Sequence, residues 1–307
     1  MIEARAVSKR YGGRTAVDGA TFTVVPGAVT GFLGPNGAGK STTIRMIMGL
    51  DAPTSGSVTV NGKAYAHHPA PLREVGALLE AKAIHPGRSA YHHLLALALT
   101  TGIPRRRVEE VLDLVGLTGV AHQRAGGFSL GMGQRLGMAA ALLGDPATLI
   151  LDEPVNGLDP QGILWIRTLL RRLAAEGRTV FVSSHLMSEM ALTADHLVVI
   201  GRGRVIAETS VREFISRASA DVVRVRTPRA AELRELLTGP GIDVTSTAPG
   251  LLEVHGVGSA EVGLLACRHH IPLEELAPVE ASLEEAFMEL TDDALEYRVH
   301  ETEGHPA

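Results

Sequence analysis

The feature that most constrains this chain is a glycine-rich segment at residues 34–41, which follows an apolar strand pattern and precedes a helical one. The segment fits G-x-x-x-x-G-K-[ST] at every fixed position. Glycines let a backbone turn its N–H groups inward around phosphate oxygens, and the start of the next helix adds partial positive charge there. We therefore expect a phosphate loop made of Gly34, Pro35, Asn36, Gly37, Ala38, Gly39, Lys40 and Ser41.

The end of this loop predicts nucleotide chemistry. Lys40 can reach the β- and γ-phosphates of a nucleoside triphosphate, and the Ser41 hydroxyl can ligate Mg²⁺. Thr42, the next residue, is expected to join the nucleotide site. The alternative is a glycine-rich turn that matches by coincidence, and the strand–loop–helix context argues against it.

Two carboxylates follow a second apolar strand pattern at residues 148–151. A parallel sheet presents its ligands at such strand ends. We expect Asp152 to hold Mg²⁺ through water and Glu153 to polarise the attacking water. A cation beside Asp152 would make two adjacent carboxylates tolerable. The alternative is a solvent-exposed Asp-Glu-Pro turn.

A histidine stands at the end of the next apolar strand pattern, at residues 179–183. His185 is placed there to meet the γ-phosphate on the other side of the water, which makes it a candidate catalytic residue. A single histidine is more often an ordinary surface or core residue. Its position 32 residues after Glu153 at a parallel strand end favours the functional interpretation.

The order of the patterns predicts an α/β protein with a second, smaller domain. Strands expected at residues 2–33, 57–60, 148–151 and 179–183 alternate with helices expected at residues 41–50, 89–143 and 163–175. This alternation indicates a largely parallel sheet. The tail has the order β-α-β-β-α-β of a ferredoxin-like α+β unit, followed by a last helix. The predicted domains are residues 1–215 and 216–307.

Composition excludes several classes of protein. The net charge of −5 and 4% aromatic content argue against a nucleic-acid partner. One cysteine, Cys267, excludes an internal disulfide and a cysteine-based zinc site. The apolar runs are far shorter than the ~18–20 residues of a spanning helix, and the N-terminus does not look like a secretory signal. Any membrane role would therefore need a separate partner.

A further segment at residues 128–135 resembles a family signature. It is similar to Leu-Ser-Gly-Gly-Gln of the ATP-binding subunits of ABC transporters, with Ser129 and Gly131 kept. Leu130 replaces a glycine and Met132 replaces the glutamine, a variation of antibiotic-export branches. The resemblance covers about residues 2–215. It implies an ABC-type cassette, with a helical subdomain at about residues 81–145 and an antiparallel N-terminal sheet.

The resemblance also implies roles for single residues. Tyr11 takes the place of the aromatic that stacks on adenine, while Ser129 and Gly131 form a second phosphate-binding end. The segment at residues 156–159 resembles the loop that contacts the partner subunit's nucleotide site. Glu80 stands where the family has a glutamine whose oxygen ligates Mg²⁺ and whose loop touches the membrane partner.

The implied function is transport-coupled ATP hydrolysis with ATP and Mg²⁺. Two copies would sandwich each ATP between the phosphate loop of one and Ser129 of the other. A separate transmembrane permease would carry the substrate, which places the chain at the cytoplasmic face of the membrane as a peripheral homodimer that exports antibiotics or other small molecules. The alternatives are a soluble ATPase of this type acting on ribosomes or DNA, a P-loop kinase or GTPase, and an inactive ATP-binding module. A GTPase would need an N-K-x-D base reader, which is absent.

Overall fold

The computed structural model describes residues 1–80, 84–218, 222–279 and 281–291. The chain divides into a first compact unit, Met1–Ser210, and a second that begins at Val211. The sequence places this boundary five residues later, after residue 215. Part of the predicted helical subdomain, at residues 81–83, and parts of the predicted tail domain, at residues 219–221, 280 and 292–307, lie outside the described residues.

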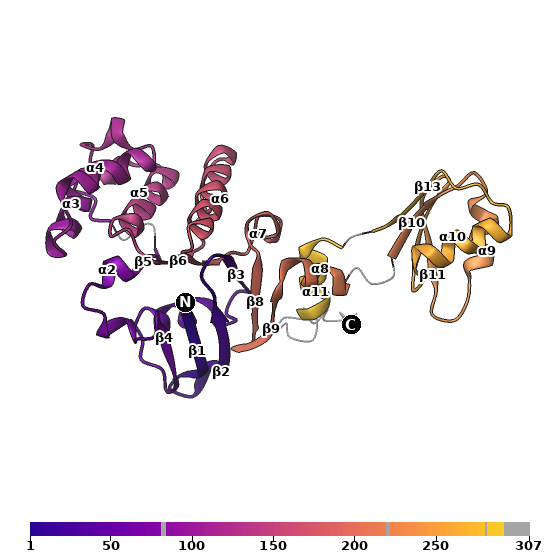
Figure 1. Ribbon diagram of the computed structural model, residues 1–307, viewed down its shortest axis with the longest axis horizontal. Helices are drawn as coiled ribbons and strands as arrows, with labels where there is room; N and C mark the ends of the chain where they lie inside the picture. Colours follow the sequence, from indigo (N-terminus) through magenta and orange to yellow (C-terminus); the bar gives the residue numbers. More distant parts are fainter. Residues whose placement is uncertain (81–83, 219–221, 280, 292–307) are drawn as a thin grey trace, which may run out of the picture. The chain divides into compact units, whose positions relative to one another are not determined.

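Two sheets build the first unit (Figure 1). A three-stranded antiparallel sheet has the order β2-β1-β4, and a six-stranded sheet has the order β5-β6-β7-β3-β8-β9 with only β9 antiparallel. The strands are β1 (Ile2–Tyr11), β2 (Arg14–Val24), β3 (Val29–Leu33), β4 (Ser55–Val60), β5 (Val75–Leu78), β6 (Thr148–Asp152), β7 (Thr179–Ser183), β8 (His196–Gly201) and β9 (Arg204–Ser210).

The central strands β3, β6 and β7 are buried almost throughout. Strands covered on both faces read as continuous apolar runs, which is why the sequence shows them clearly. The rings of Phe22, Phe32 and Phe181 pack together, with the Phe32 and Phe181 centroids 5.0 Å apart. Because the three strands are parallel and neighbouring, the residues that follow them lie along one edge of the sheet.

The helices of the first unit include a compact group of three, α3, α4 and α5 (Figure 1). Helix α1 begins at Lys40 and ends at Ile47, so it is shorter at its end than the sequence pattern suggests, because Gly49 has a left-handed φ of 65°. The helices are α1 (Lys40–Ile47), α2 (Pro71–Glu74), α3 (Ala90–Thr100), α4 (Arg105–Leu114), α5 (Leu130–Leu142), α6 (Pro160–Ala175) and α7 (Met187–Thr193).

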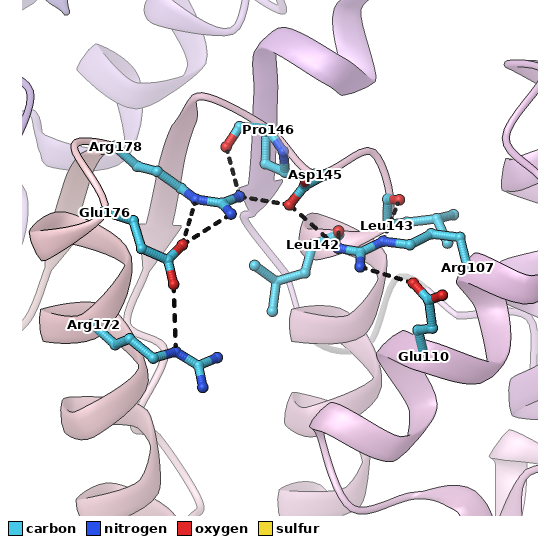
Figure 2. A network of polar contacts seen from close by, with 9 residues as sticks. All are labelled: Arg107, Glu110, Leu142, Leu143, Asp145, Pro146, Arg172, Glu176 and Arg178. Atoms are coloured by element: carbon cyan, nitrogen blue, oxygen red, sulfur yellow. Dashed lines mark hydrogen bonds and ion pairs between the residues drawn. The ribbon is translucent and has the colours of Figure 1, made fainter.

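A polar network holds the C-terminal end of α5 (Figure 2). Asp145, just after the helix, accepts hydrogen bonds from Arg107 of α4 at 3.4 Å and from Arg178 at 2.8 Å. Arg107 also donates to the carbonyl oxygens of Leu142 at 3.0 Å and Leu143 at 3.3 Å. These bonds satisfy the last carbonyl groups of α5 and tie α4, α5 and the turn before β7 together.

The second unit is built around a four-stranded antiparallel sheet of order β11-β12-β10-β13. The predicted β-α-β-β-α-β order is confirmed, with an apolar core that includes Val225, Leu233 and Val254. Its elements are α8 (Val211–Ala218), β10 (Val222–Arg226), α9 (Ala230–Leu237), β11 (Asp243–Ala248), β12 (Leu251–His255), α10 (Ser259–Arg268), β13 (Glu275–Pro278) and α11 (Leu283–Thr291). Of the helices in the described part of the chain, none has the length and apolar character to cross a membrane.

Candidate functional site

The glycine-rich segment forms a loop between β3 and α1. Its last residue, Gly39, precedes the helix with a φ of 108° and no side-chain cap, so the first N–H groups of α1 have no side-chain partner at this cap. A Cβ on Gly39 would lie 2.7 Å from the carbonyl oxygen of Ala16, and one on Gly34 would collide with the carbonyl oxygen of Ile200. Only glycine fits these two positions, which explains the spacing of the motif.

Lys40 lies folded into this loop. Its side chain is buried, and its Nζ donates hydrogen bonds to the carbonyl oxygens of Gly34 at 2.5 Å and Pro35 at 3.2 Å. Burial lowers the pKa of Lys40, although the charges of Glu153 and Asp152 oppose that shift. A bound phosphate would give the ammonium group a closer anionic partner and would favour its charged form.

Asp152 ends β6 directly opposite the start of α1. Its Oδ2 accepts a hydrogen bond from Ser41 Oγ at 3.1 Å, and its Oδ1 accepts one from the hydroxyl of Ser183. Ser183 is the parallel neighbour of Asp152 on β7, so the sheet register itself brings the two together. The carboxylate is therefore fixed toward Ser41 from both sides.

Glu153 is the next residue, and its backbone has a left-handed φ of 51°. Such a conformation costs a non-glycine residue about 1–3 kcal/mol and persists only where its surroundings enforce it. Here the N–H of Glu153 donates to Ser183 Oγ at 3.1 Å, and its carbonyl oxygen accepts from Gln134 Nε2 at 3.0 Å. Its Oε2 lies 2.7 Å from His185 Nδ1.

These groups surround a hollow of about 560 Å³. The structure gathers there most of the residues that the sequence assigns to nucleotide and metal: Tyr11, Pro35, Asn36, Gly37, Gly39, Lys40, Ser41, Thr42, Asp152 and Glu153. The hollow thus joins a loop of backbone N–H groups, a buried cation and two carboxylates, which is a set suited to a polyphosphate with a divalent cation.

Tyr11 stands at the mouth of this hollow and is 48% exposed. Its hydroxyl donates to Asp51 Oδ2 at 2.9 Å, and Asp51 is itself held by Arg45 Nε at 2.7 Å. Lys9 Nζ lies 5.0 Å from the ring centroid. The ring is thereby oriented at the surface, where a planar base can stack on it.

Other predicted residues lie outside the wall of the hollow. Gly34 and Ala38 belong to the loop but do not line the space, and His185 reaches it through its contact with Glu153. Glu80 is exposed beyond the end of β5 and is likewise not among the lining residues.

Ser129 and Gly131 lie at the start of α5. Ser129 is the N-cap, and its Oγ accepts a hydrogen bond from the N–H of Met132 at 3.2 Å. Leu130 is 51% exposed and packs on Gly157, where an added Cβ would collide with it. The start of α5 is therefore attached to the loop after β6 in the same chain.

Several lining residues escaped the sequence analysis: Arg14, Thr15, Ala16, Arg202 and Gly203. The N–H of Gly203 donates to the carbonyl oxygen of Ala38 at 3.0 Å, so the turn between β8 and β9 supports the phosphate loop. This contact joins residues far apart in the chain, so no local sequence pattern predicts it. Gln134 and Ser183, which form hydrogen bonds with the acidic pair, were missed for the same reason.

Comparison with known families covers both units. The family model described as "ABC transporter" matches residues 17–156. A second model, "Domain of unknown function (DUF8746)", matches residues 221–284.

Curated relatives and solved structures extend these matches. The chain is 37% identical to an uncharacterized ABC transporter ATP-binding protein, YhcH of Bacillus subtilis (strain 168), over 98% of its own length and 99% of the relative. It is 43% identical to the bacitracin transport ATP-binding protein BcrA of Bacillus licheniformis, over 68% of this chain and 69% of that one. A dimeric structure of a bacterial ABC transporter cassette matches with a TM-score of 0.64 at 26% identity, covering 69% of this chain and 99% of that one.

Proposed function

Because this chain belongs to the ATP-binding subunits of ABC transporters, we propose that it drives export by hydrolysing ATP between two of its copies. The single observation that supports the site most directly is the hollow that Lys40, Ser41, Asp152 and Glu153 share. The phosphate loop holds the β- and γ-phosphates through its N–H groups and Lys40, and Tyr11 stacks on the adenine. Base-specific hydrogen bonds are not required for this binding.

The residues beside Lys40 fit Mg²⁺. The hydroxyl of Ser41 donates a 3.1 Å hydrogen bond to Asp152 Oδ2, so two hard oxygen donors stand side by side at the hollow. Ser41 would ligate the cation directly, and Asp152 would hold it through water. The bound cation would offset the charge of the phosphates and of Asp152.

Glu153 is the general base in this proposal. Its carboxylate lines the hollow on the side of Asp152, and it takes the proton of the water that attacks the γ-phosphate. His185, with Nδ1 at 2.7 Å from Glu153 Oε2, fixes the direction of that carboxylate. In this proposal its ring would also contact the γ-phosphate. The products are ADP and inorganic phosphate.

Two copies close over the nucleotide in this mechanism. The phosphates held by one phosphate loop contact Ser129 and the start of α5 in the other copy. ATP thereby bridges two helix N-termini, each of which carries partial positive charge. Loss of the γ-phosphate removes that bridge and lets the dimer open. The dimeric cassette similar to this chain supports a two-copy arrangement.

The transported substrate belongs to a separate permease. A relative named for bacitracin transport supports an antibiotic or similar small molecule as cargo. The permease would be a transmembrane subunit that docks on the helical subdomain, with this chain on the cytoplasmic face, where ATP is supplied. Co-expression with its permease should raise antibiotic resistance of a sensitive host, and Lys40→Ala should cancel that gain.

The proposed base can be tested by Glu153→Gln. Turnover should fall about 10²- to 10⁴-fold because the general base is lost, while ADP affinity stays unchanged because the phosphate loop is intact. Phosphate release and calorimetry measure the two quantities. Glu109→Gln, an exposed position on α4, is the matched control. Full turnover in Glu153→Gln would remove Glu153 from the mechanism.

A further inference from the structure

Gln134 is a buried polar residue for which the mechanism above has no use. It lies on α5 with only 4% of its surface exposed, and its Nε2 donates a 3.0 Å hydrogen bond to the carbonyl oxygen of Glu153. A polar side chain is buried at a cost that only a well-made hydrogen bond offsets. The reason for burying Gln134 therefore lies with the acceptor of this hydrogen bond, Glu153.

Glu153 is the residue whose backbone needs such support. Its φ of 51° is rarely adopted by residues other than glycine. Ser183 holds the Glu153 N–H, at 3.1 Å through its hydroxyl and 3.2 Å through its carbonyl. Gln134 holds the carbonyl on the other side of the same residue, together with the N–H of Asn156 at 3.3 Å. The direction of the Glu153 carboxylate depends on this backbone conformation.

Gln134 also belongs to the helix that Ser129 caps. It lies five positions after Ser129 along the chain, which in an α-helix is a rise of ~7.5 Å. The same helix makes a second contact with the loop after β6, because Leu130 packs on Gly157. The start of α5 is thus joined at two points to the segment that begins with the proposed base.

The far end of α5 is held as well. Asp145 and the carbonyl groups of Leu142 and Leu143 are bonded by Arg107 and Arg178 (Figure 2). These bonds tie the C-terminal end of α5 to α4 and to the turn before β7, so we expect any movement of the helix on docking to be largest at its N-terminal end.

We propose that Gln134 is a positioning residue that couples the start of α5 to the carboxylate of Glu153 in the same chain. When a second copy docks its nucleotide on Ser129, the N-terminal end of α5 is displaced and moves Gln134. This movement sets the backbone of Glu153 so that its carboxylate can take the proton of the attacking water. A subunit thereby senses the nucleotide held by its partner and adjusts hydrolysis of its own. This inference rests on the proposed role of Glu153 as base.

The variant Gln134→Met tests this coupling, because methionine keeps the length of the side chain and removes the N–H donor. We expect kcat to fall about tenfold, as for a lost hydrogen bond in a positioned site, while ADP affinity stays at the control value. Gln161→Met, at an exposed position on α6, is the control. An unchanged kcat, or ADP affinity that falls in step with kcat, would overturn the proposal.

A double-mutant cycle separates positioning from a merely structural role. If Gln134 acts through the carboxylate of Glu153, adding Gln134→Met to Glu153→Gln causes no further loss of the residual turnover. An additive loss would contradict the proposal. If Glu153→Gln alone keeps full turnover, the base role and the coupling both fail. If Glu153→Gln loses turnover and Gln134→Met does not, only the coupling fails.

Discussion

Helices α1 and α5 both start at a segment that the family resemblance assigns to phosphate, yet their first turns are satisfied differently. Gly39 precedes α1 with no side-chain cap, and the hollow lies in front of it. Ser129 precedes α5, and its own hydroxyl accepts the N–H of Met132. The start of α1 thus leaves its N–H groups available to a ligand, whereas at the start of α5 the Ser129 hydroxyl already accepts one of the N–H groups.

The two starts also differ in charge. At α1 the buried Lys40 adds a full positive charge to the helix dipole. At α5 the first turn has neither acidic nor basic side chains in the described structure, and the exposed Leu130 stands beside Ser129. We infer that α1 sets the affinity for nucleotide and α5 sets only what happens after a second copy arrives. Three predictions test this division, from the largest effect to the smallest.

Lys40→Ala should have the largest effect. Losing a charged hydrogen-bond donor to phosphate removes ~3 kcal/mol of the binding free energy, which lowers the nucleotide affinity roughly a hundredfold. Titration calorimetry with ADP measures the loss, and thermal unfolding shows whether losing the Lys40 hydrogen bonds to the carbonyls of Gly34 and Pro35 weakens the fold. Lys63→Ala, at an exposed turn, is the control. Wild-type affinity in Lys40→Ala would mean that α1 does not bind phosphate through this residue.

Ser129→Arg should leave ADP affinity unchanged and abolish nucleotide-driven dimerisation. The long charged side chain fills the space that a second copy must enter, while the phosphate loop is untouched. Size-exclusion chromatography with ATP in the Glu153→Gln background measures the dimer. Ser129→Ala removes the cap at a cost of ~1 kcal/mol without adding bulk, so it should weaken the dimer less than Ser129→Arg does. A stable dimer in Ser129→Arg would contradict the assignment of α5 as the second phosphate end.

The pH dependence of nucleotide affinity gives the smallest effect. Burial lowers the pKa of Lys40 in the free protein, and bound phosphates raise it, so binding takes up a proton at alkaline pH. Affinity is therefore full below the free-state pKa and falls as the pH rises through it. ADP titrations above pH ~8, where phosphates are fully ionised, should show this decline. Lys40→Arg, which stays charged, should abolish it; a decline that survives in that variant would assign the titration elsewhere.

Local sequence patterns were sufficient to predict much of the fold. The continuous apolar runs of β3, β6 and β7 predicted a parallel sheet, and the sheet is observed. The alternation of strand and helix patterns in the tail predicted the ferredoxin-like order, and that order is observed too. Boundaries were less exact, as at the end of α1, because the left-handed Gly49 ends the helix before the apolar spacing does. The assignments of single residues to catalysis and metal stay predictions.

The sequence by itself determined the phosphate loop and the acidic pair, because each is a short run of residues whose chemistry is set by near neighbours along the chain. Only the tertiary structure decided which distant groups support them. Ser183 meets Asp152 through the register of two parallel strands, Gln134 reaches Glu153 from another helix, and Gly203 supports the loop from a hairpin turn. Such contacts depend on packing across the fold, so no local periodicity or motif encodes them.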